Sequence, residues 1–275
     1  MTNPKQLLDQ HGIHPKKRLG QNFLHDPNTL EKIVATAELM PEDIVVEVGA
    51  GTGTLTAVLA QHVRHVFSVE IDERLRPILE TELALYDNVY LIFDDFLKVD
   101  VAQLVGGQDF VVVANVPYYI TSAILRHLLE CQSRPRCLVL TVQQELAERI
   151  LAHPPMMNLL AISVQFYGNP QIVTRLKPGV FWPRPEVDSA VIKIDTYAAP
   201  AVPVPGEKQF FRVARAGFGQ KRKQLRNALG SGLGVKAAIA GQLLEKAGID
   251  PSRRAETLTL EEWGILTGVV AQELP

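Results

Sequence analysis

Asn115, Pro117 and Tyr118 stand close together in the segment Asn115–Tyr119, which reads Asn-Val-Pro-Tyr-Tyr. An Asn side-chain oxygen can accept a hydrogen bond from an amino group, and a proline fixes the turn that aims the carbonyl of Val116. A Tyr ring offers a flat face on which another ring can stack. These residue types in this order predict a site that holds the exocyclic amine and the ring of a nucleobase.

The segment before this motif, Asp109–Ala114, is predicted to be a buried strand. It is rich in Val, carries one Phe and shows no alternation of polar and apolar residues, which is typical of a strand covered on both faces. The motif would then follow the carboxyl end of a strand. Open α/β sheets bind their ligands at that edge.

Three earlier strands are predicted at Ile44–Val48, His65–Val69 and Val89–Phe93, and a helix that begins at Asp26-Pro27 precedes the first of them. The alternation of strands and helices favours parallel βαβ units with right-handed crossovers, which bring all strand ends to one side of the sheet. We therefore expect the residues that follow these strands to lie near the motif. They are the glycine turn Gly49–Gly53, Glu70 and Asp95.

The glycine turn predicts a close approach of the backbone to a ligand. The dinucleotide fingerprint requires Gly or Ala three residues after its second glycine, and Thr54 stands there, which disfavours a nicotinamide enzyme. Glu70, about 20 residues past the turn, is suited to accept hydrogen bonds from both hydroxyls of a ribose. A carboxylate after the third strand could accept a hydrogen bond from an adenine amino group, so these residues together predict a nucleoside site.

The composition is that of an ordinary globular protein, with 47% hydrophobic and 21% charged residues among 275. This length predicts one large domain with a smaller one, or two domains. No apolar run approaches the roughly 18 residues of a membrane helix, and the first residues lack the apolar core of a signal peptide, so we expect a cytoplasmic protein. Cys131 and Cys137 have no partner at metal-binding spacing, which predicts reduced thiols and no metal site.

The chain after the motif predicts two helices, three more strands and then a change of character. The helices are Ile120–Leu129 and Gln143–Arg149, and the strands are Cys137–Val142, Leu159–Tyr167 and Ala190–Ile194. The segment Asp195–Gly206 contains three prolines and reads as a stiff linker, after which only helical spacing remains. We therefore expect one domain over residues 1–195 and a helical domain over 196–275.

The C-terminal domain is the basic end of the chain. Residues 196–275 hold 11 Lys and Arg against 7 Asp and Glu, although the whole chain has a net charge of −2. The segment Gln220–Asn227 contains four of these basic residues: Lys221, Arg222, Lys223 and Arg226. Such a run is usually a solvated surface, and it also suits contact with phosphates, so both interpretations stand at this point.

Six motifs in one order resemble those of the ribosomal RNA adenine N6,N6-dimethyltransferases, and among these most closely the small-subunit enzymes. They are Gly20–Leu24, Glu47–Gly53, Ser68–Asp72, Asp95, Asn115–Tyr118 and Phe181–Ser189. The resemblance extends from Arg18 to Leu229 and therefore covers most of the chain. It departs at Tyr119, where the family usually carries Asn.

The resemblance implies a Rossmann-like class I methyltransferase sheet with helices on both faces, followed by a small all-helical domain, and S-adenosylmethionine as the methyl donor. It further implies cofactor contacts for six residues. Asn22 and Leu24 would line the pocket, Gly49 would approach the methionine part, Glu70 would hold the ribose, Asp95 would meet the adenine amine, and Asn115 would sit between cofactor and target.

The same resemblance implies the catalytic arrangement. Asn115 and the carbonyl of Val116 would each accept one N–H of the target amine, with Pro117 fixing the turn. Tyr118 would stack on one face of the target adenine and Phe181 on the other. The four basic residues of Gln220–Asn227 would contact RNA phosphates, which supplies affinity and register without reading base identity.

The implied activity is dimethylation at N6 of two adjacent adenosines near the 3′ end of 16S rRNA, in the 30S subunit or its precursor, with a part in small-subunit biogenesis. We expect a monomer that uses no metal. Two alternatives remain: a large-subunit rRNA adenine dimethyltransferase, and a ribosome-assembly factor that has lost catalysis. The segment Phe218–Leu229 favours the small-subunit kind, and the intact Asn115, Pro117, Tyr118, Glu70 and Asp95 argue against loss of catalysis.

Overall fold

A computed structural model describes residues 3–131, 133–220 and 222–274, and the backbone alone of Lys17. The described residues of 1–147 and 169–196 form one compact unit, and those of 148–168 and 197–275 form a second. The expected division into 1–195 and 196–275 differs from this grouping in residues 148–168 and in Thr196. We describe each unit by itself.

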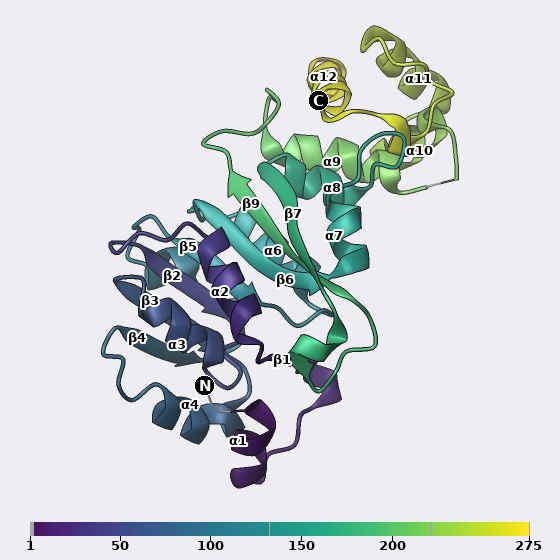
Figure 1. Cartoon of the computed structure of the whole chain (residues 1–275). Coiled ribbons are helices and arrows are strands. Elements are labelled where there is room, and N and C mark those ends of the chain that lie inside the picture. Colours follow the sequence, from purple (N-terminus) through teal and green to yellow (C-terminus); the bar gives the residue numbers. More distant parts are fainter. Residues whose placement is uncertain (1–2, 132, 221, 275) are drawn as a thin grey trace. The chain divides into compact units, whose positions relative to one another are not determined.

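A seven-stranded sheet in the order β4-β3-β2-β5-β6-β9-β7 forms the centre of the first unit (Figure 1). The first five strands in this order run parallel, and β9 runs antiparallel to β6. The strands are β2 (Ile44–Val48), β3 (His65–Glu70), β4 (Val89–Phe93), β5 (Val111–Asn115), β6 (Cys137–Gln143), β7 (Gly168–Leu176) and β9 (Ser189–Thr196). A separate pair joins β1 (Phe23–Leu24) to β8 (Phe181–Trp182).

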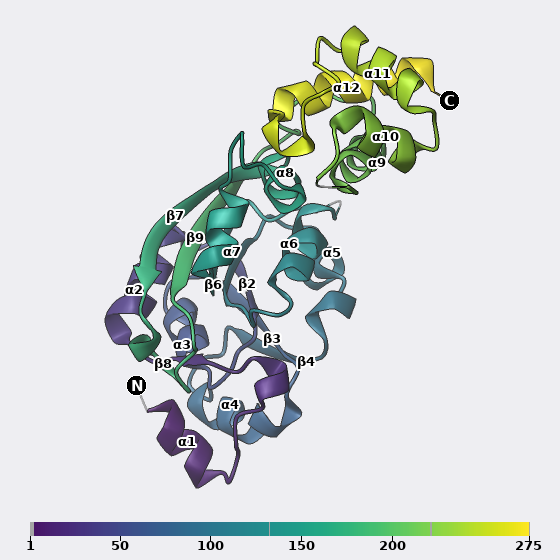
Figure 2. The same cartoon turned by 90° about the vertical axis from the view of Figure 1, so that its right-hand side faces the viewer.

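Helices cover both faces of this sheet, with α2 and α3 on one side and α5 and α6 on the other (Figure 2). One apolar cluster joins the inward faces of α2 and α3 to alternate valines of the sheet, among them Val45, Val66 and Val113. The helices of this unit are α1 (Pro4–Gln10), α2 (Pro27–Thr36), α3 (Thr54–Ala60), α4 (Arg76–Glu82), α5 (Val101–Leu104), α6 (Thr121–Leu129) and α7 (Gln144–Ile150), the last of which crosses into the second unit.

Local sequence accounts for these elements. Helix α2 begins where Asp26 accepts a hydrogen bond from the backbone N–H of Thr29 at 2.8 Å, and Pro27 fills the first helical position, where its missing N–H costs nothing. The central strand β5 is fully buried up to Asn115. The α/β class, the five parallel strands and the helices over 121–129 and 144–150 are therefore confirmed.

The prediction of a strand over Leu159–Tyr167 is wrong, because α8 (Leu159–Gln165) occupies that segment. The side chain of Asn158 accepts from the backbone N–H of Ala161 at 3.1 Å and so starts a helix, and a short apolar run by itself does not distinguish a strand from a buried helix. The strand lies directly afterwards, as β7, in a segment whose mixed polar residues gave little strand signal. Helix α1 was also missed.

The second unit is helical. It contains α8, α9 (Glu207–Phe218), α10 (Leu225–Leu233), α11 (Ala237–Lys246) and α12 (Leu260–Glu273). Phe166 stacks on Phe210 with ring centroids 4.3 Å apart, which binds the segment 148–168 to α9. Trp263 of α12 is fully buried against α9, where a Cβ at Gly217 would lie 2.3 Å from the Trp263 ring, so only glycine permits this approach. Among the described residues, no helix is long and apolar enough to cross a membrane.

Candidate active site

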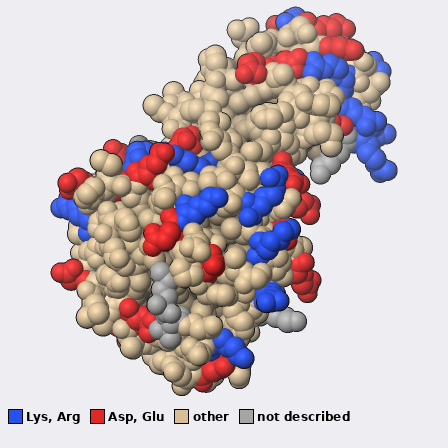
Figure 3. All heavy atoms as spheres, in the orientation of Figure 1, with Lys and Arg blue, Asp and Glu red and all other residues tan. Residues whose placement is uncertain are grey.

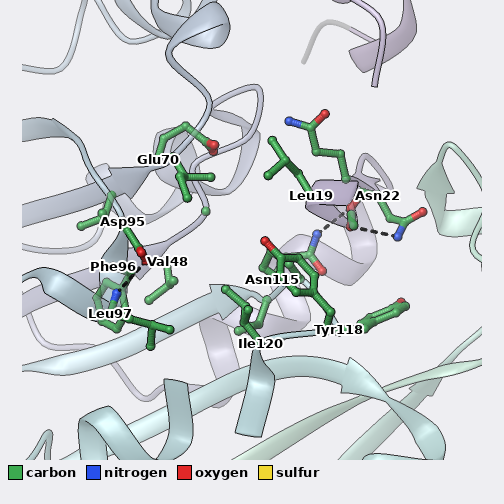
Figure 4. A pocket seen from close by; sticks show the side chains of 18 of the residues that line it. Leu19, Asn22, Val48, Glu70, Asp95, Phe96, Leu97, Asn115, Tyr118 and Ile120 are labelled. Carbon is green, nitrogen blue, oxygen red and sulfur yellow. Dashed lines mark hydrogen bonds between the residues drawn. The ribbon is translucent and has the colours of Figure 1, made fainter. Parts of the chain in front are cut away.

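A pocket of about 220 Å³ opens at the carboxyl ends of the parallel strands (Figure 4). Figure 4 shows Glu70 and Asp95 along one side of it and Asn115, Tyr118 and Asn22 along the other. The lining residues come from five chain segments: Leu19–Phe23, Val48–Gly49, Val69–Ile71, Asp94–Leu97 and Asn115–Ile120. The pocket therefore brings Asn22, Gly49, Glu70, Asp95 and Asn115 together, although they are far apart in the sequence.

The glycine turn after β2 is formed by residues with a left-handed backbone. Gly49 and Gly51 have φ of +83° and +58°, a region that residues with a Cβ rarely adopt. A Cβ at Gly51 would also lie 3.0 Å from the ring of Phe23. The turn is thus held in a shape that exposes backbone atoms of Gly49, and no side chain from this position narrows the pocket.

Glu70 is the last residue of β3, is only 6% exposed, and has both carboxylate oxygens fixed. Oε2 accepts from the backbone N–H of Gly51 at 2.9 Å, and Oε1 accepts from that of Asp72 at 2.8 Å. Burial raises the pKa of Glu70, against the opposing effect of these two hydrogen bonds. Each oxygen keeps a second lone pair, so the carboxylate can still accept from a diol in the pocket.

Asp95 lies at the pocket wall as the residue that starts a short 3₁₀ turn, η3 (Phe96–Lys98). Its Oδ1 accepts from the backbone N–H of Leu97 at 3.1 Å. This bond fixes the carboxylate beside the apolar side chains of Phe96 and Leu97. A carboxylate acceptor next to apolar walls suits a flat ring that carries an amino group.

Asn115 ends β5, and its side-chain amide has a defined orientation. Nδ2 donates to the backbone carbonyl of Asn22 at 2.8 Å (Figure 4). Because the two ends of an amide point in different directions, this bond leaves Oδ1 as the group available to accept a hydrogen bond. Val116 and Pro117 line the pocket next to it.

Tyr118 contributes its ring to the pocket, and its hydroxyl group lies 2.6 Å from Oγ of Ser189 on β9. Burial raises the pKa of the Tyr118 phenol, so it stays neutral at physiological pH. Tyr119 has a different environment, since 58% of it is exposed at the pocket wall. The hydrogen bond to Ser189 therefore fixes the ring of Tyr118, whereas no such bond to another of the described residues holds the hydroxyl group of Tyr119.

Leu24 and Phe181 do not line this pocket. They are register partners across the β1–β8 pair, and both belong to the apolar cluster under α2 and α3. Phe181 is 1% exposed. In this structure the two side chains support the wall of the site from behind.

The structure adds pocket residues that sequence reasoning missed, among them Gln21, Ile71 and Ile120. Ile71 and Ile120 each follow directly on a predicted site residue or motif, so their neighbours in the sequence were the available signal. Gln21 stands inside Gly20–Leu24, directly before the predicted site residue Asn22, and that position in the motif was the available signal.

Glu47 lies beneath the glycine turn and is only 1% exposed. Its Oε2 accepts from the hydroxyl groups of Thr56 at 2.6 Å and Ser68 at 2.5 Å, which joins β2 to α3 and β3. Burial raises the pKa of Glu47 to about 8, and the two hydroxyl groups only partly offset it. Glu47 therefore braces the turn from below and does not face the pocket.

The basic segment lies in the second unit, in the turn between α9 and α10 and at the start of α10. Arg222, Lys223 and Arg226 are exposed, and Lys221 lies outside the described residues. Figure 3 shows Lys and Arg side chains gathered along the edge that this turn occupies in Figure 1. Cys131 and Cys137 are free thiols, and in the described parts of the chain no three His, Cys, Asp or Glu gather as a metal site would require.

The fold and the pocket define the class of protein: a methyltransferase with a Rossmann-like sheet, a glycine turn after its first parallel strand, and carboxylates after the next two. Two solved structures share this architecture. The 23S rRNA methyltransferase ErmE is 27% identical with a TM-score of 0.73, covering 91% of this chain and 100% of its own. A dimethyladenosine transferase from Plasmodium falciparum is 24% identical with a TM-score of 0.74, covering 91% of this chain and 96% of its own.

The chain belongs to the ribosomal RNA adenine dimethylase family, whose model matches residues 13–266. Relatives of this chain match it over nearly the whole length of both proteins. "Ribosomal RNA small subunit methyltransferase A" of Dehalococcoides mccartyi is 43% identical over 97% of this chain and 92% of that protein. The protein of the same name from Clostridium botulinum is 42% identical over 98% of both chains.

Proposed function

We propose that this protein transfers methyl groups from S-adenosylmethionine to N6 of two adjacent adenosines near the 3′ end of 16S rRNA, giving N6,N6-dimethyladenosine. The observation that carries the proposal is the orientation of the Asn115 amide, since its Nδ2 is bound to the carbonyl of Asn22 and its Oδ1 is left to accept from an amine. Membership of the rRNA adenine dimethylase family supports the reaction type.

The polar groups that line the pocket fit S-adenosylmethionine. Glu70 offers carboxylate oxygens to the two ribose hydroxyls, and Asp95 offers one to the adenine amine between apolar walls. Gly49 lines the pocket without a side chain, so that the methionine part could lie against its backbone. When bound there, the cofactor supplies a methyl group made electrophilic by a sulfonium sulfur.

The protein's own part in the reaction is to hold the target nitrogen. The N6 amine of adenosine is a weak nucleophile because its lone pair is delocalised into the ring. Oδ1 of Asn115 and the carbonyl of Val116 each accept one N–H, which favours a pyramidal nitrogen whose lone pair faces the methyl group. Correct positioning of two reactants recovers roughly 7–11 kcal/mol of a barrier. No dedicated base is required, because the methylated amine is cationic and strongly acidic.

The bond changes balance without another reactant. With S-adenosylmethionine bound, the nitrogen would gain the methyl group as the sulfonium sulfur releases it, and the cationic amine would then lose a proton to water. Tyr118 stacks on the adenine ring and keeps it in the plane that this attack requires. Because the target base must leave its own helix or loop to enter, we expect a flipped adenosine.

The second unit supplies affinity for RNA through the exposed Arg222, Lys223 and Arg226, with Lys221 outside the described residues. The small-subunit target rests on relatives at 42–45% identity that are named for the small subunit, against 27% for the large-subunit methyltransferase ErmE. We propose that the protein acts as a monomer on the 30S subunit or its precursor. Action on the precursor would give it a part in small-subunit biogenesis.

The test uses labelled S-adenosylmethionine and ribosomal particles that lack these methyl groups. Digestion of 30S particles after incubation should yield labelled N6,N6-dimethyladenosine, and parallel 50S particles should yield none. Label on 50S particles alone would support the large-subunit alternative. Tight binding to 30S particles without any label would support an assembly factor.

A further inference from the structure

Asp72 lies just outside the pocket, two residues after Glu70, and it gathers donors from distant parts of the chain. Only 3% of it is exposed. Nε and Nη2 of Arg74 donate to it at 2.9 and 2.6 Å, and Nε2 of Gln21 donates at 2.9 Å. Nζ of Lys16 lies 3.5 Å away. A buried carboxylate that accepts from Gln21 and pairs with two cations, Arg74 and Lys16, is held in one orientation.

These contacts outweigh the cost of burial. Burial alone would raise the pKa of Asp72, but the hydrogen bonds from Arg74 and Gln21 bring it well below its usual range. Asp72 is therefore ionised throughout the physiological range. Its negative charge holds the segment Lys16–Asn22, which we call the arm, against the end of β3.

Gln21 uses both ends of its amide in this arrangement. Its Nε2 donates to Oδ2 of Asp72, and its Oε1 accepts from the backbone N–H of Lys16 at 2.7 Å. Arg74 adds a bond from Nη1 to the carbonyl of His14 at 3.3 Å. An ionised Glu in place of Gln21 could accept but not donate, and Ala could do neither.

The arm is fixed a second time on the opposite side of Gln21. Gly20 has a left-handed backbone with φ of +60°, and a Cβ there would lie 3.3 Å from the ring of Tyr119 and 3.5 Å from Pro117. The arm thus packs directly on the motif that carries Asn115. This contact also gives Tyr119 a place in the site, because its ring supports the arm.

Directly after these two fixed residues comes Asn22, whose carbonyl accepts from Nδ2 of Asn115. Asn22 follows Gln21 directly, so a shift of Gln21 moves this acceptor. The χ2 torsion of an Asn has broad wells, and an amide without a partner at one end turns readily. Release of the arm would therefore let Oδ1 of Asn115 turn away from the target amine.

We propose that Gln21 and Asp72 are positioning residues that set the catalytic orientation of the Asn115 amide through the carbonyl of Asn22. The proposal rests on the proposed function for the identity of the target amine. Gln21 and Asp72 act through Asn115 and are not required to touch the substrate. Their effect belongs to turnover and not to RNA affinity.

The first test compares kcat and KM on 30S particles lacking the methyl groups. Gln21→Ala should lower kcat on the order of 10- to 100-fold with little change in KM for the particles, as expected for lost orientation. Gln21→Glu should lower kcat similarly, because it keeps the acceptor for Lys16 and loses the donor to Asp72. Gln61→Ala is the matched control, since Gln61 also donates to a backbone carbonyl but lies outside the pocket.

The second test does not depend on activity. In ¹⁵N-labelled protein without cofactor, the side-chain NH₂ resonances of Asn115 are assigned by their loss in Asn115→Ala. They should shift in Gln21→Ala and in Asp72→Asn and stay in place in Gln61→Ala. Because Gln21 is polar and lies on the arm, outside the apolar cluster under α2 and α3, its substitution should leave the fold intact, which the other amide resonances report.

The outcomes separate the two proposals. If the wild type is active and Gln21→Ala has the same kcat, the positioning role is overturned and the proposed function stands. Unshifted Asn115 resonances in both variants also overturn it. A wild type that forms no dimethyladenosine overturns the proposed function, and with it the catalytic meaning of the arm.

Discussion

The polar side chains of the pocket and those of the basic turn in the second unit are held in opposite ways. In and beside the pocket, Glu70 and Asp72 accept hydrogen bonds on both carboxylate oxygens, and one bond from Nδ2 orients the amide of Asn115. Arg222, Lys223 and Arg226 extend from an exposed turn. Methyl transfer depends on placing two atoms within a fraction of an ångström, whereas contact with phosphates needs only positive charge within reach. The difference shows where this protein requires geometry and where charge suffices.

The largest expected effect comes from removing the side-chain amide of Asn115. Asn115→Ala should lower kcat on the order of 1000-fold, because it removes an acceptor for the target amine together with the anchor to Asn22. Single-turnover methylation of 30S particles measures it. Cofactor affinity should change little in the same variant. A loss of cofactor binding that matches the loss of turnover would place Asn115 in cofactor binding alone and weaken the contrast.

The basic turn should respond in affinity and not in turnover. Changing Arg222, Lys223 and Arg226 to Ala together should weaken particle binding roughly 10- to 100-fold and reduce the slope of log affinity against log salt by about 2. At saturating particles, kcat should stay near that of the wild type. Binding isotherms at several salt concentrations give both values.

The control for this variant is Lys236→Ala with Lys246→Ala, which removes exposed lysines elsewhere in the same unit. A salt slope that falls equally in the control would mean that general charge, and not this turn, contacts RNA. A fall in kcat at saturation would show that the turn also positions the target. Either result would break the contrast between the two regions.

Most of what positions the glycine turn and the two carboxylates of the pocket was predictable from the sequence. Runs such as Ile44–Val48 and Val111–Ala114 are local signals of buried strands, and the rule that parallel strands end at one edge then places Gly49, Glu70 and Asp95 together. Each step needs only neighbouring residues. The structure confirms the strands and brings these residues to one pocket.

The arm was not predictable, because its contacts join residues far apart in the chain. Gln21 lies 51 positions from Asp72, and Asn22 lies 93 from Asn115. Polar partners at such distances leave no pattern in one sequence. The same holds for Leu24 and Phe181, since their motif does not say whether the side chains face the pocket or, as here, the cluster under α2 and α3.

Buried Glu47 gives a smaller effect with a distinct pH signature. Its pKa is about 8 in the folded protein against 4.5 for an ordinary Glu, so the folded state binds the proton more tightly. Its contribution to stability is fully present below pH 4.5 and is lost as pH rises toward 8, with a slope of at most about 1.4 kcal/mol per pH unit. Glu47→Gln cannot ionise, so its stability relative to wild type should rise over this interval.

Denaturant unfolding of both proteins at pH 5, 6, 7 and 8 measures this difference, and the other titrating groups cancel in the comparison. The Tyr118→Phe variant, which loses a hydrogen bond but no carboxyl group, should show a difference in stability from wild type that is flat with pH. A flat difference for Glu47→Gln as well would mean that Glu47 stays ionised when buried. The brace under the glycine turn would then be a charged one.

The smallest expected effect is that of Tyr118→Phe, which tests the role of the ring apart from that of the hydroxyl group. The variant keeps the stacking face and loses the hydrogen bond to Ser189, so stability should fall by about 1 kcal/mol and kcat by only a few fold. Tyr118→Ala, which removes the ring as well, should lose roughly 10-fold or more in kcat, since a stacking contact with a base contributes about 1–3 kcal/mol. If Tyr118→Phe is as slow as Tyr118→Ala, orientation of the ring by Ser189 governs catalysis, and the fixed geometry of the pocket extends to its aromatic wall. If the two differ as expected, the ring itself suffices and the strict requirement for geometry is confined to the Asn115 amide and the arm that holds it.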